Sequence, residues 1–479
     1  MVFRGPPAPE GPLFVRIVTA AVAALTLAAT ALPAASAASA APQDPPSATD
    51  GVWRMDGHGT LLVLGGGALR EYQTTAVSCM EGDSARQTGP GTYTTPDGTA
   101  LTVRTTPDRA HARLAADRSA GHRRLTRTRA LPAACTRPPA TDPRADFDVL
   151  WQTFEENYPF FAQKGVDWHA VRDRYRPQVH RNTTRAGLFD IFSRMLRPLH
   201  DAHVAVRDGD RVFAGVRPGT EPPGKELDAR VKEFILARDL KDATGLQDLA
   251  AGRITYAGLR GDLGYLRISG FGGYAGADAP YTAERAELDR ALDTVLTPGR
   301  TRHLKGLIND LRVNGGGSDA LGLRIAARLT DTPCTAYAKR VRDDPADPTR
   351  HTRPEPVPVV PAAATRYTGP VAVLTGGSTV SAGETFTQAL LDRPGRTVRI
   401  GRPTQGVFSD VMTRYLADGM LFVLPNEEYP TRTGRTFDGT GIPPRLSEPV
   451  FTEEEFAHDR DSAFDRAVSV LAPRSPSSG

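Results

Sequence analysis

Two turns rich in serine and glycine, in the second half of the sequence, could support acyl-transfer chemistry. The more specific one lies in Gly369–Leu391, GPVAVLTGGSTVSAGETFTQALL, where a buried strand is predicted to run into a turn and then into a helix that begins at Ser381. A serine hydroxyl there lies beside backbone N–H groups and the positive end of the helix dipole, so a developing oxyanion would find donors in place. The residues Ser381-Ala-Gly-Glu384 also have the form of a helix capping box, and that interpretation stays open.

The other turn lies upstream, within Gly306–Gly322, GLINDLRVNGGGSDALG. A buried strand is predicted to end at Asn314-Gly315-Gly316-Gly317, with a helix after it. Consecutive glycines tolerate positive φ and allow close approach to the backbone, which suits an oxyanion hole built from amide N–H groups. An ordinary strand-to-helix turn has the same composition, so these glycines alone do not decide between the two interpretations.

Both turns, together with several further motifs, resemble the tail-specific (C-terminal processing) family of serine peptidases. DLRVNGGG resembles the family's D-L-R-x-N-x-G-G segment, and TVSAGE resembles its nucleophile turn. YLRISGF, LHDAHV, GRPTQGVFSD and DGTGIPPR resemble other family motifs, in the family's order, within Phe147 to Leu471. The resemblance implies an α/β core of crotonase-like or ClpP-like type, with Ser381 as the nucleophile and with Gly316 and the amide of Ala382 facing the oxyanion.

The general base separates two branches of this family. One branch carries a lysine in a T-F-G-K element, but Val407 stands at the lysine position in Thr404-Gln405-Gly406-Val407, and no other lysine is near it in the sequence. A Ser/Lys dyad is therefore not expected. The chain is more similar to the other branch, which includes the tricorn core and interphotoreceptor retinoid-binding protein. That resemblance implies His203 as the base and Asp438 as the carboxylate of the site.

A histidine base fits the chemistry, because serine is a weak nucleophile on its own and imidazole accepts protons near neutral pH. The tricorn-like branch has a second serine directly before the histidine, where this sequence has Ala202. This difference leaves open whether Asp201 or water orients His203. A helix-end histidine and an Asp-Gly turn are the structural alternatives for His203 and Asp438. His200 and His203 lack an evident third ligand, so neither a metal nor another cofactor is expected.

Alternating strands and helices are predicted to position these residues. Three apolar segments have the character of strands, namely Leu263–Ser269, His303–Arg312 and Gly369–Thr375. The last two are each followed by a helical segment, ALGLRIAARL and GETFTQALL respectively. Such alternation favours a mainly parallel sheet covered by helices. We therefore assign residues 256–472 to an α/β catalytic core.

Smaller units are predicted before the core. Short runs separated by turn residues, such as LLVL before Gly65-Gly66-Gly67, predict a small β domain over residues 51–136. Apolar residues at helical spacing in FDVLWQTFEENYPFF and GLFDIFSRMLRPL predict a helical bundle over residues 146–206. Residues 207–255 are assigned as a linker region with one mixed-charge helix. This interval is too short for the peptide-binding PDZ domain that other family members carry there.

The composition argues against a nucleic-acid partner. The chain has 479 residues, and its 59 Lys and Arg are nearly balanced by 55 Asp and Glu. The densest basic stretch, residues 118–129, contains no aromatic residue that could stack on bases.

The N-terminal segment predicts export. Arg4 and Arg16 precede an uncharged stretch, Ile17–Ala40, that ends in small-x-small steps, which is the layout of a secretory signal peptide over residues 1–40. An uncleaved membrane anchor is the alternative, because the stretch is long enough to span a bilayer. Pro33 and the Ala/Ser-rich end favour cleavage, after which no stable membrane anchor is expected.

Export makes the cysteines informative, because disulfides form in oxidising compartments. Cys79 and Cys135 share the first segment and are predicted to form a disulfide, which would close a loop worth roughly 4 kcal/mol. Cys334 lies far downstream and is predicted to remain free.

These features predict a secreted serine peptidase that cleaves polypeptides by acyl transfer. A non-catalytic binder of an apolar ligand is one alternative, because the family includes retinoid-binding relatives, and an esterase is another. A binding protein need not retain Ser381, His203 and the glycine turn together, and their joint presence favours an enzyme.

Overall fold

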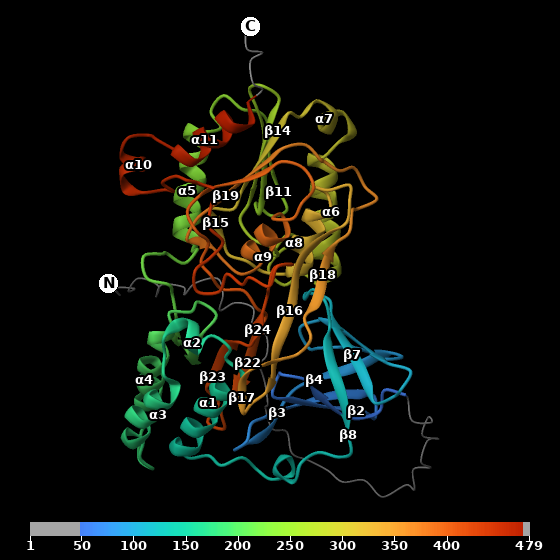
Figure 1. Cartoon of the computed structure of the whole chain (residues 1–479), viewed down its shortest axis with the longest axis vertical. Coiled ribbons are helices and arrows are strands. Elements are labelled where there is room, and N and C mark those ends of the chain that lie inside the picture. The colour runs from blue at the N-terminus through green and yellow to red at the C-terminus, as the bar shows by residue number, and fades with distance from the viewer. Residues whose placement is uncertain (1–47, 473–479) are drawn as a thin grey trace, which may run out of the picture.

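The computed structural model describes residues 48–472 and consists of a β-barrel, a helical region and a larger α/β core (Figure 1). The signal peptide predicted for residues 1–40 lies outside the described residues. Within residues 48–472, no helix has the length and apolar character needed to cross a membrane.

The N-terminal unit is a closed antiparallel barrel whose strands follow one another in chain order. They are β1 (Gly51–Met55), β2 (Thr60–Gly65), β3 (Ala68–Thr74), β4 (Cys79–Gly89), β5 (Thr92–Thr94), β6 (Ala100–Thr105), β7 (His111–Ala116) and β8 (Arg123–Thr128). Successive side chains of a strand point to opposite faces, and one set fills the barrel interior. Trp53, Leu62, Leu114 and Leu125 belong to this buried core.

The disulfide predicted from the sequence is confirmed. It joins Cys79, at the start of β4, to Cys135 in the short 3-10 helix η2 (Ala133–Thr136). It therefore fixes the chain where the barrel passes into the helical region. Cys334 is free and partly buried.

The helical region packs helices on a small antiparallel sheet. Its helices are α1 (Pro143–Asn157), α2 (Phe161–Lys164), α3 (Trp168–Tyr175) and α4 (Arg185–Leu196). The sheet has the order β10 (Arg211–Ala214), β9 (Ala205–Asp208), β23 (Leu421–Pro425) and β22 (Val411–Tyr415). In α1, Phe147, Leu150 and Phe154 lie at i, i+3 and i+7, and all are buried in the shared core. Phe422 of β23 belongs to the same core, so a late part of the chain completes this region.

The α/β core is built on a seven-stranded sheet of order β11-β12-β13-β14-β19-β21-β25. Its strands are β11 (Thr244–Leu249), β12 (Ile254–Leu259), β13 (Leu263–Ile268), β14 (Gly306–Asp310), β19 (Val371–Thr375), β21 (Thr397–Gly401) and β25 (Leu446–Ser447). From β13 to β25 the neighbours are parallel, whereas β11 and β12 are antiparallel. The predicted α/β fold is confirmed.

Helices cover both faces of this sheet (Figure 1). One face carries α6 (Tyr281–Val295), α8 (Asp319–Ala326) and α9 (Ala382–Ala389), and the other carries α5 (Lys225–Arg238) and α11 (Ser462–Leu471). Two shorter helices are α7 (Pro298–His303) and α10 (Glu453–Ala457). Strands buried on both faces have continuous apolar sequences, as in VAVLT of β19.

Residues 207–255, assigned from the sequence as a linker region, carry regular structure. They include β10, α5 and β11, and β11 forms an edge of the core sheet. Both strands are largely exposed. Neither strand shows the regular alternation of apolar and polar residues by which a half-buried strand is recognised in a sequence.

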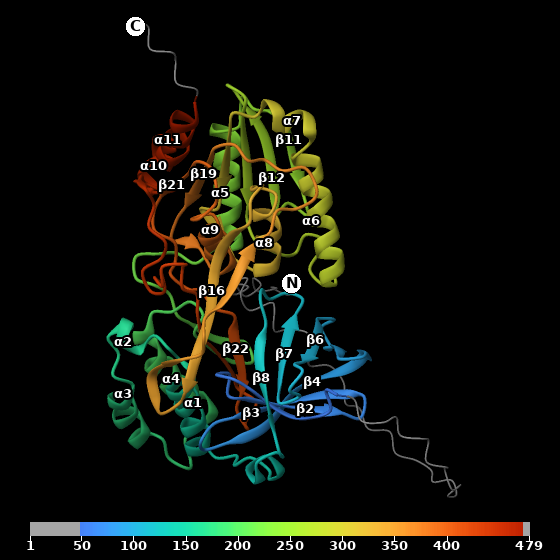
Figure 2. The same ribbon diagram turned by 45° about the vertical axis from the view of Figure 1, so that its right-hand side comes forward.

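The long strand β16 (Cys334–Asp344) leaves the core and extends past the barrel and the helical region (Figure 2). It pairs with β17 (Asp347–His351), β18 (Glu355–Val359) and β24 (Glu427–Glu428). It thus links the core to both N-terminal units.

Candidate active site

Ser381 lies at the N-terminus of α9 with φ 55° and ψ −119°. Positive φ is uncommon for a residue other than glycine, and such a conformation costs about 1–3 kcal/mol unless the surroundings hold it. The N–H of Ser381 donates to Oε2 of Glu384 at 3.2 Å, which is one of the contacts that hold it. The side chain of Ser381 is only partly buried, so a substrate has access to it.

The glycine turn packs directly against this serine. The short parallel strands β15 (Val313–Asn314) and β20 (Ser378–Thr379) pair and bring the two turns together. A Cβ on Gly316 would lie 2.7 Å from Cβ of Ser381 and 2.9 Å from the carbonyl oxygen of Val380. Gly316 also has φ 75°. The position therefore requires glycine both for its conformation and for its space.

The two predicted oxyanion donors differ in their surroundings. The N–H of Gly316 donates to Oδ1 of Asn314 at 2.9 Å, so it is already engaged. Nδ2 of Asn314 donates to the carbonyl of Ile268 at 2.7 Å, which fixes the amide orientation. Ala382 is the first residue of α9, where an N–H has no intrahelical acceptor. The N–H of Ala382 is therefore the better placed donor for a developing negative charge.

Glu384 connects the nucleophile turn to a second segment of the site. Its carboxylate accepts from the N–H groups of Gly406 at 2.6 Å and Val407 at 2.8 Å as well as from Ser381. The side chain is fully buried, and this desolvation raises its pKa to about 7 although the bound N–H groups lower it. The sequence indicated Glu384 only as a capping-box residue and gave no sign of its contacts with residues 406–407.

His203 lies in the turn between η4 (Arg197–Leu199) and β9 and is 3% exposed. Its Nδ1 is 2.9 Å from the carbonyl oxygen of Phe408. A carbonyl oxygen only accepts, so Nδ1 carries the hydrogen and Nε2 of the neutral ring keeps its lone pair. Burial lowers the pKa of His203, an effect opposed in part by Asp201. The ring is thus neutral near pH 7 and able to accept a proton.

Contacts to its ring and to its backbone orient His203. The ring is held by the carbonyl of Phe408, whereas Oδ1 of Asp201 accepts from the backbone N–H of His203 at 2.9 Å. Oδ2 of Asp201 accepts from the hydroxyl of Tyr158 at 2.8 Å. Asp201, one of the two groups considered from the sequence, therefore positions the backbone rather than the imidazole.

Asp438 also contacts Phe408. Its Oδ1 accepts from the N–H of Phe408 at 3.3 Å, and Oδ2 has no hydrogen-bond partner among the described residues. The side chain is buried, which, together with the nearby Asp201, raises its pKa well above the ordinary value. Asp438 therefore acts on the site through the backbone N–H of Phe408.

His203 and Asp438 thus both contact the segment 406–408, and Ser381 is connected to it through Glu384. Glu384 links Ser381 to Val407, and the peptide groups of Phe408 bind the other two residues. Phe408 acts through backbone atoms, so no side-chain motif in the sequence could reveal its role.

Lys164 of α2 also approaches this region, although no lysine is near Val407 in the sequence. Its Nζ lies 3.4 Å from the carbonyl oxygen of His200 and 3.9 Å from Oδ2 of Asp201. Across residues 48–472, no group of three or more His, Cys, Asp or Glu side chains is arranged to hold a metal ion.

Two parts of the chain match models of known protein families. Residues 262–447 match the model of peptidase family S41, and residues 139–197 match the tricorn protease C1 domain. Residues 262–447 thus carry an S41 peptidase domain, in agreement with the serine peptidase that the sequence motifs predicted. It is a hydrolase that acts on polypeptides.

Several solved structures are similar to this chain. A candidate peptidase from Parabacteroides merdae is 25% identical, with a TM-score of 0.58 over 70% of this chain and 98% of that one. The photosystem II D1 C-terminal processing protease is 19% identical, with a TM-score of 0.42 over 65% and 94% of the two chains. Mature CPAF is 13% identical, with a TM-score of 0.49 over 69% and 96%. No curated protein is significantly similar in sequence.

Proposed function

We propose that this protein is a secreted endopeptidase in which Ser381 is the nucleophile and His203 is its general base. The contact between Nδ1 of His203 and the carbonyl of Phe408, 2.9 Å, carries the proposal. It supports a tautomer in which Nε2 carries the lone pair that accepts the serine proton. The lowered pKa of the buried ring supports the same role, because the base is unprotonated at neutral pH.

The reaction then has two acyl-transfer steps. Oγ of Ser381 adds to the scissile carbonyl as its proton passes to Nε2 of His203, and the oxyanion lies toward the N–H of Ala382. The imidazolium returns the proton to the leaving amine, which departs and leaves an ester on Ser381. Water then attacks the ester with His203 again as base, and Ser381 regains its proton as the carboxylate product leaves.

Export is the second element of the proposal. The uncharged stretch Ile17–Ala40 with its small-residue end supports it, and so does the Cys79–Cys135 disulfide, because structural disulfides persist mainly in oxidising compartments. N-terminal sequencing of protein recovered from the culture medium tests this element. A first residue between Ser36 and Asp44 is expected, and protein that retains Met1 in the membrane fraction would contradict it.

A fluorophosphonate probe and an unfolded polypeptide substrate test the enzymatic element. The wild type should be labelled and should cleave the polypeptide, Ser381→Ala should do neither, and His203→Ala should do both far more slowly. Hydrolysis of a nitrophenyl ester without cleavage of any polypeptide would favour the esterase alternative. Absence of labelling and of hydrolysis in the wild type would favour a binding protein.

A further inference from the structure

The turn between β7 and β8 of the barrel, residues 117–122, reaches the active-site region of the core (Figure 2). On one side, Oγ of Ser318 donates to the carbonyl oxygen of Arg118 at 2.7 Å. Ser318 directly follows the glycine turn and is the N-cap of α8. The barrel backbone therefore contacts the element that packs against Ser381.

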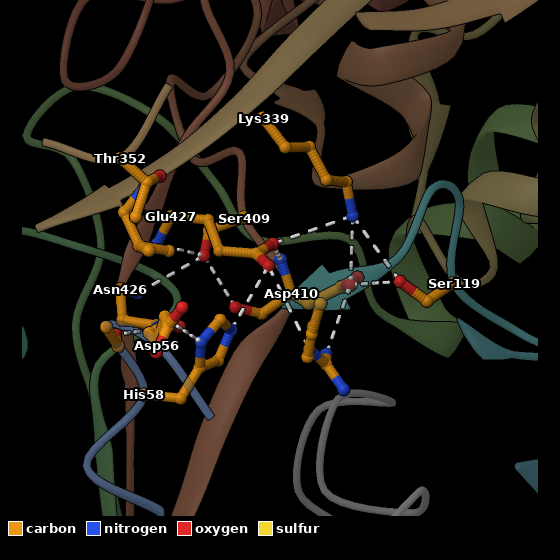
Figure 3. A network of polar contacts seen from close by, with 12 residues as sticks. Asp56, His58, Ser119, Lys339, Thr352, Ser409, Asp410, Asn426 and Glu427 are labelled. Atoms are coloured by element: carbon orange, nitrogen blue, oxygen red, sulfur yellow. Dashed lines mark hydrogen bonds and ion pairs between the residues drawn. The ribbon is translucent and has the colours of Figure 1, made fainter. Parts of the chain in front are cut away.

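On the other side, the barrel contacts Asp410, two residues after Phe408 (Figure 3). Oδ2 of Asp410 accepts from Oγ of Ser119 and lies 3.4 Å from Nη2 of Arg123, both of the barrel. The same oxygen accepts from Nζ of Lys339 on β16 at 3.0 Å. Asp410 is thus held jointly by the barrel and by the core.

Ser409, between Phe408 and Asp410, has φ 81°. Its hydroxyl donates to the carbonyl of Asp410 at 2.5 Å and accepts from the N–H groups of Asn426 at 3.3 Å and Glu427 at 3.1 Å (Figure 3). A strained residue persists only where its surroundings fix it. The direction of the Phe408 carbonyl, and with it the ring of His203, therefore depends on how Asp410 is held.

The interface is a charge cluster that is most deeply buried at Lys339 and Glu427, whereas the side chains of Arg123 and Asp410 are 27% and 26% exposed. The Lys339 side chain is 9% exposed, and its Nζ lies 3.5 Å from Oε2 of Glu427, whose side chain is 5% exposed. Burial opposes the charge on Lys339, but Asp410, Glu427 and Asp319 raise its pKa, so the ammonium is retained. Buried charges require partners, and the barrel supplies two through Arg123 and through His58, whose Nε2 lies 3.5 Å from Oε1 of Glu427.

We propose that the β-barrel is a positioning domain of the peptidase, in which Ser119 and Arg123 hold Asp410 so that the Phe408 carbonyl stays aligned with His203. This inference rests on the proposed function, because it concerns the orientation of the proposed base. Ser119 and Arg123 are positioning residues, since they act through Asp410 and do not touch the reacting atoms. Arg118 adds a second contact through Ser318, on the oxyanion side of the site.

Substitutions of Ser119 and Arg123 distinguish alignment of His203 from mere attachment of the barrel to the core. Ser119→Ala combined with Arg123→Met should lower kcat at least about 10-fold and change KM less than about 2-fold, because alignment of the base affects the chemical step rather than substrate binding. Arg123→Lys in place of Arg123→Met should restore much of the lost kcat, since it returns the charge. Arg124→Met is the matched control, because Arg124 is the exposed neighbour on the same strand and should leave kcat unchanged.

The pH dependence of kcat/KM provides a second test, because a purely structural role of Asp410 would not change it. Asp201 and Asp410 both raise the pKa of His203 against the effect of burial. Asp410→Asn removes one of these charges, so the acid limb of kcat/KM should shift to lower pH. Asp410 contacts neither Ser381 nor substrate in the proposed mechanism, and a shift therefore reports on the coupling to His203.

The outcomes are distinguishable from failure of the proposed function. If the wild type and the Arg124→Met control cleave polypeptide while the double variant keeps kcat within about 2-fold, the positioning role is wrong. A lower melting temperature with unchanged kcat would show that the turn only docks the barrel. If the double variant does not fold, Ser119→Ala alone decides the question by the same kcat and KM criteria. If the wild type itself is inactive, the proposed function fails first.

Discussion

The carbonyl oxygen of Phe408 binds Nδ1 of His203 at 2.9 Å, while the N–H of the same residue binds Oδ1 of Asp438 at 3.3 Å. In a Ser-His-Asp triad the carboxylate binds the imidazole directly and fixes its tautomer. Here a backbone carbonyl fixes the tautomer, and the buried carboxyl group supports the backbone. His203, the proposed base, is therefore oriented by a peptide group that neither gains nor loses a proton near neutral pH.

Asp438→Asn should have a small effect for this reason. The asparagine Oδ1 can still accept from the N–H of Phe408, and the tautomer of His203 does not depend on the carboxylate. We expect kcat to fall by less than about 10-fold, compared with at least about 100-fold for His203→Ala. Steady-state kinetics on both variants checks this. An Asp438→Asn loss as large as that of His203→Ala would mean that the carboxylate acts on the ring directly.

The pH dependence should show a single acid limb that belongs to His203. Burial lowers the pKa of this ring below its ordinary value of 6.5. A general base is active when neutral, so kcat/KM should rise as the pH is raised through a midpoint below about 6.5 and then level off. A midpoint well above this value would point to a base other than histidine.

Lys164 allows a direct test of that alternative. Its Nζ lies 3.9 Å from Oδ2 of Asp201, in the same region as His203. Lys164→Met should lower kcat by less than about 10-fold, because its Nζ interacts with Asp201 and with the carbonyl of His200. If Lys164→Met abolished turnover and His203→Ala did not, the lysine would be the base.

Glu384→Gln should destabilise the fold by about 1–3 kcal/mol, because the glutamine NH2 group cannot accept the backbone N–H groups that the carboxylate binds. The pKa of Glu384 is raised from 4.5 to about 7 on folding. Between these two pH values, the folded state holds a proton on Glu384 that the unfolded state has lost. The stabilisation that protonated Glu384 provides is therefore fully present below pH 4.5 and is lost as the pH rises through about 7. Urea unfolding at several pH values should show the gap between wild type and Glu384→Gln narrowing as pH rises.

Removal of the disulfide by Cys79→Ser with Cys135→Ser should lower the free energy of unfolding by about 2–5 kcal/mol. The bond lies outside the active site, so activity at low temperature should be retained by the folded fraction. Cys334→Ser is the control, because this cysteine is free and its removal breaks no bond. Equal stability of the double variant and the wild type would show that the bond does not form in the protein as produced.

The sequence predicted those parts of the structure that depend on local pattern. The core strands VAVLT and LGYLRI are apolar along their whole length, and the helix that contains Phe147, Leu150 and Phe154 has clear periodicity, so both were recognisable. The exposed strands β10 and β11 carry no such pattern and were assigned to a linker region.

At the site, the sequence indicated the side chains but not the backbone that connects them. Ser381, His203, Asp438 and the glycine turn were predicted from motifs. The roles of Phe408 and Ser409 depend on a carbonyl direction and a positive φ, which residue type does not encode. Lys164 and Asp201 come together only in the folded chain.

The sheet β10-β9-β23-β22 has a consequence for how this protein matures. Its strands come from residues 205–214 and 411–425, so the hydrophobic core under α1 cannot close until a late part of the polypeptide has emerged. Pairing over such a sequence distance is slow compared with local folding. His203, which immediately precedes β9, therefore cannot be aligned with Phe408 in a partly synthesised chain. If His203 is the base as proposed, this geometry delays assembly of the active site until chain growth is nearly finished.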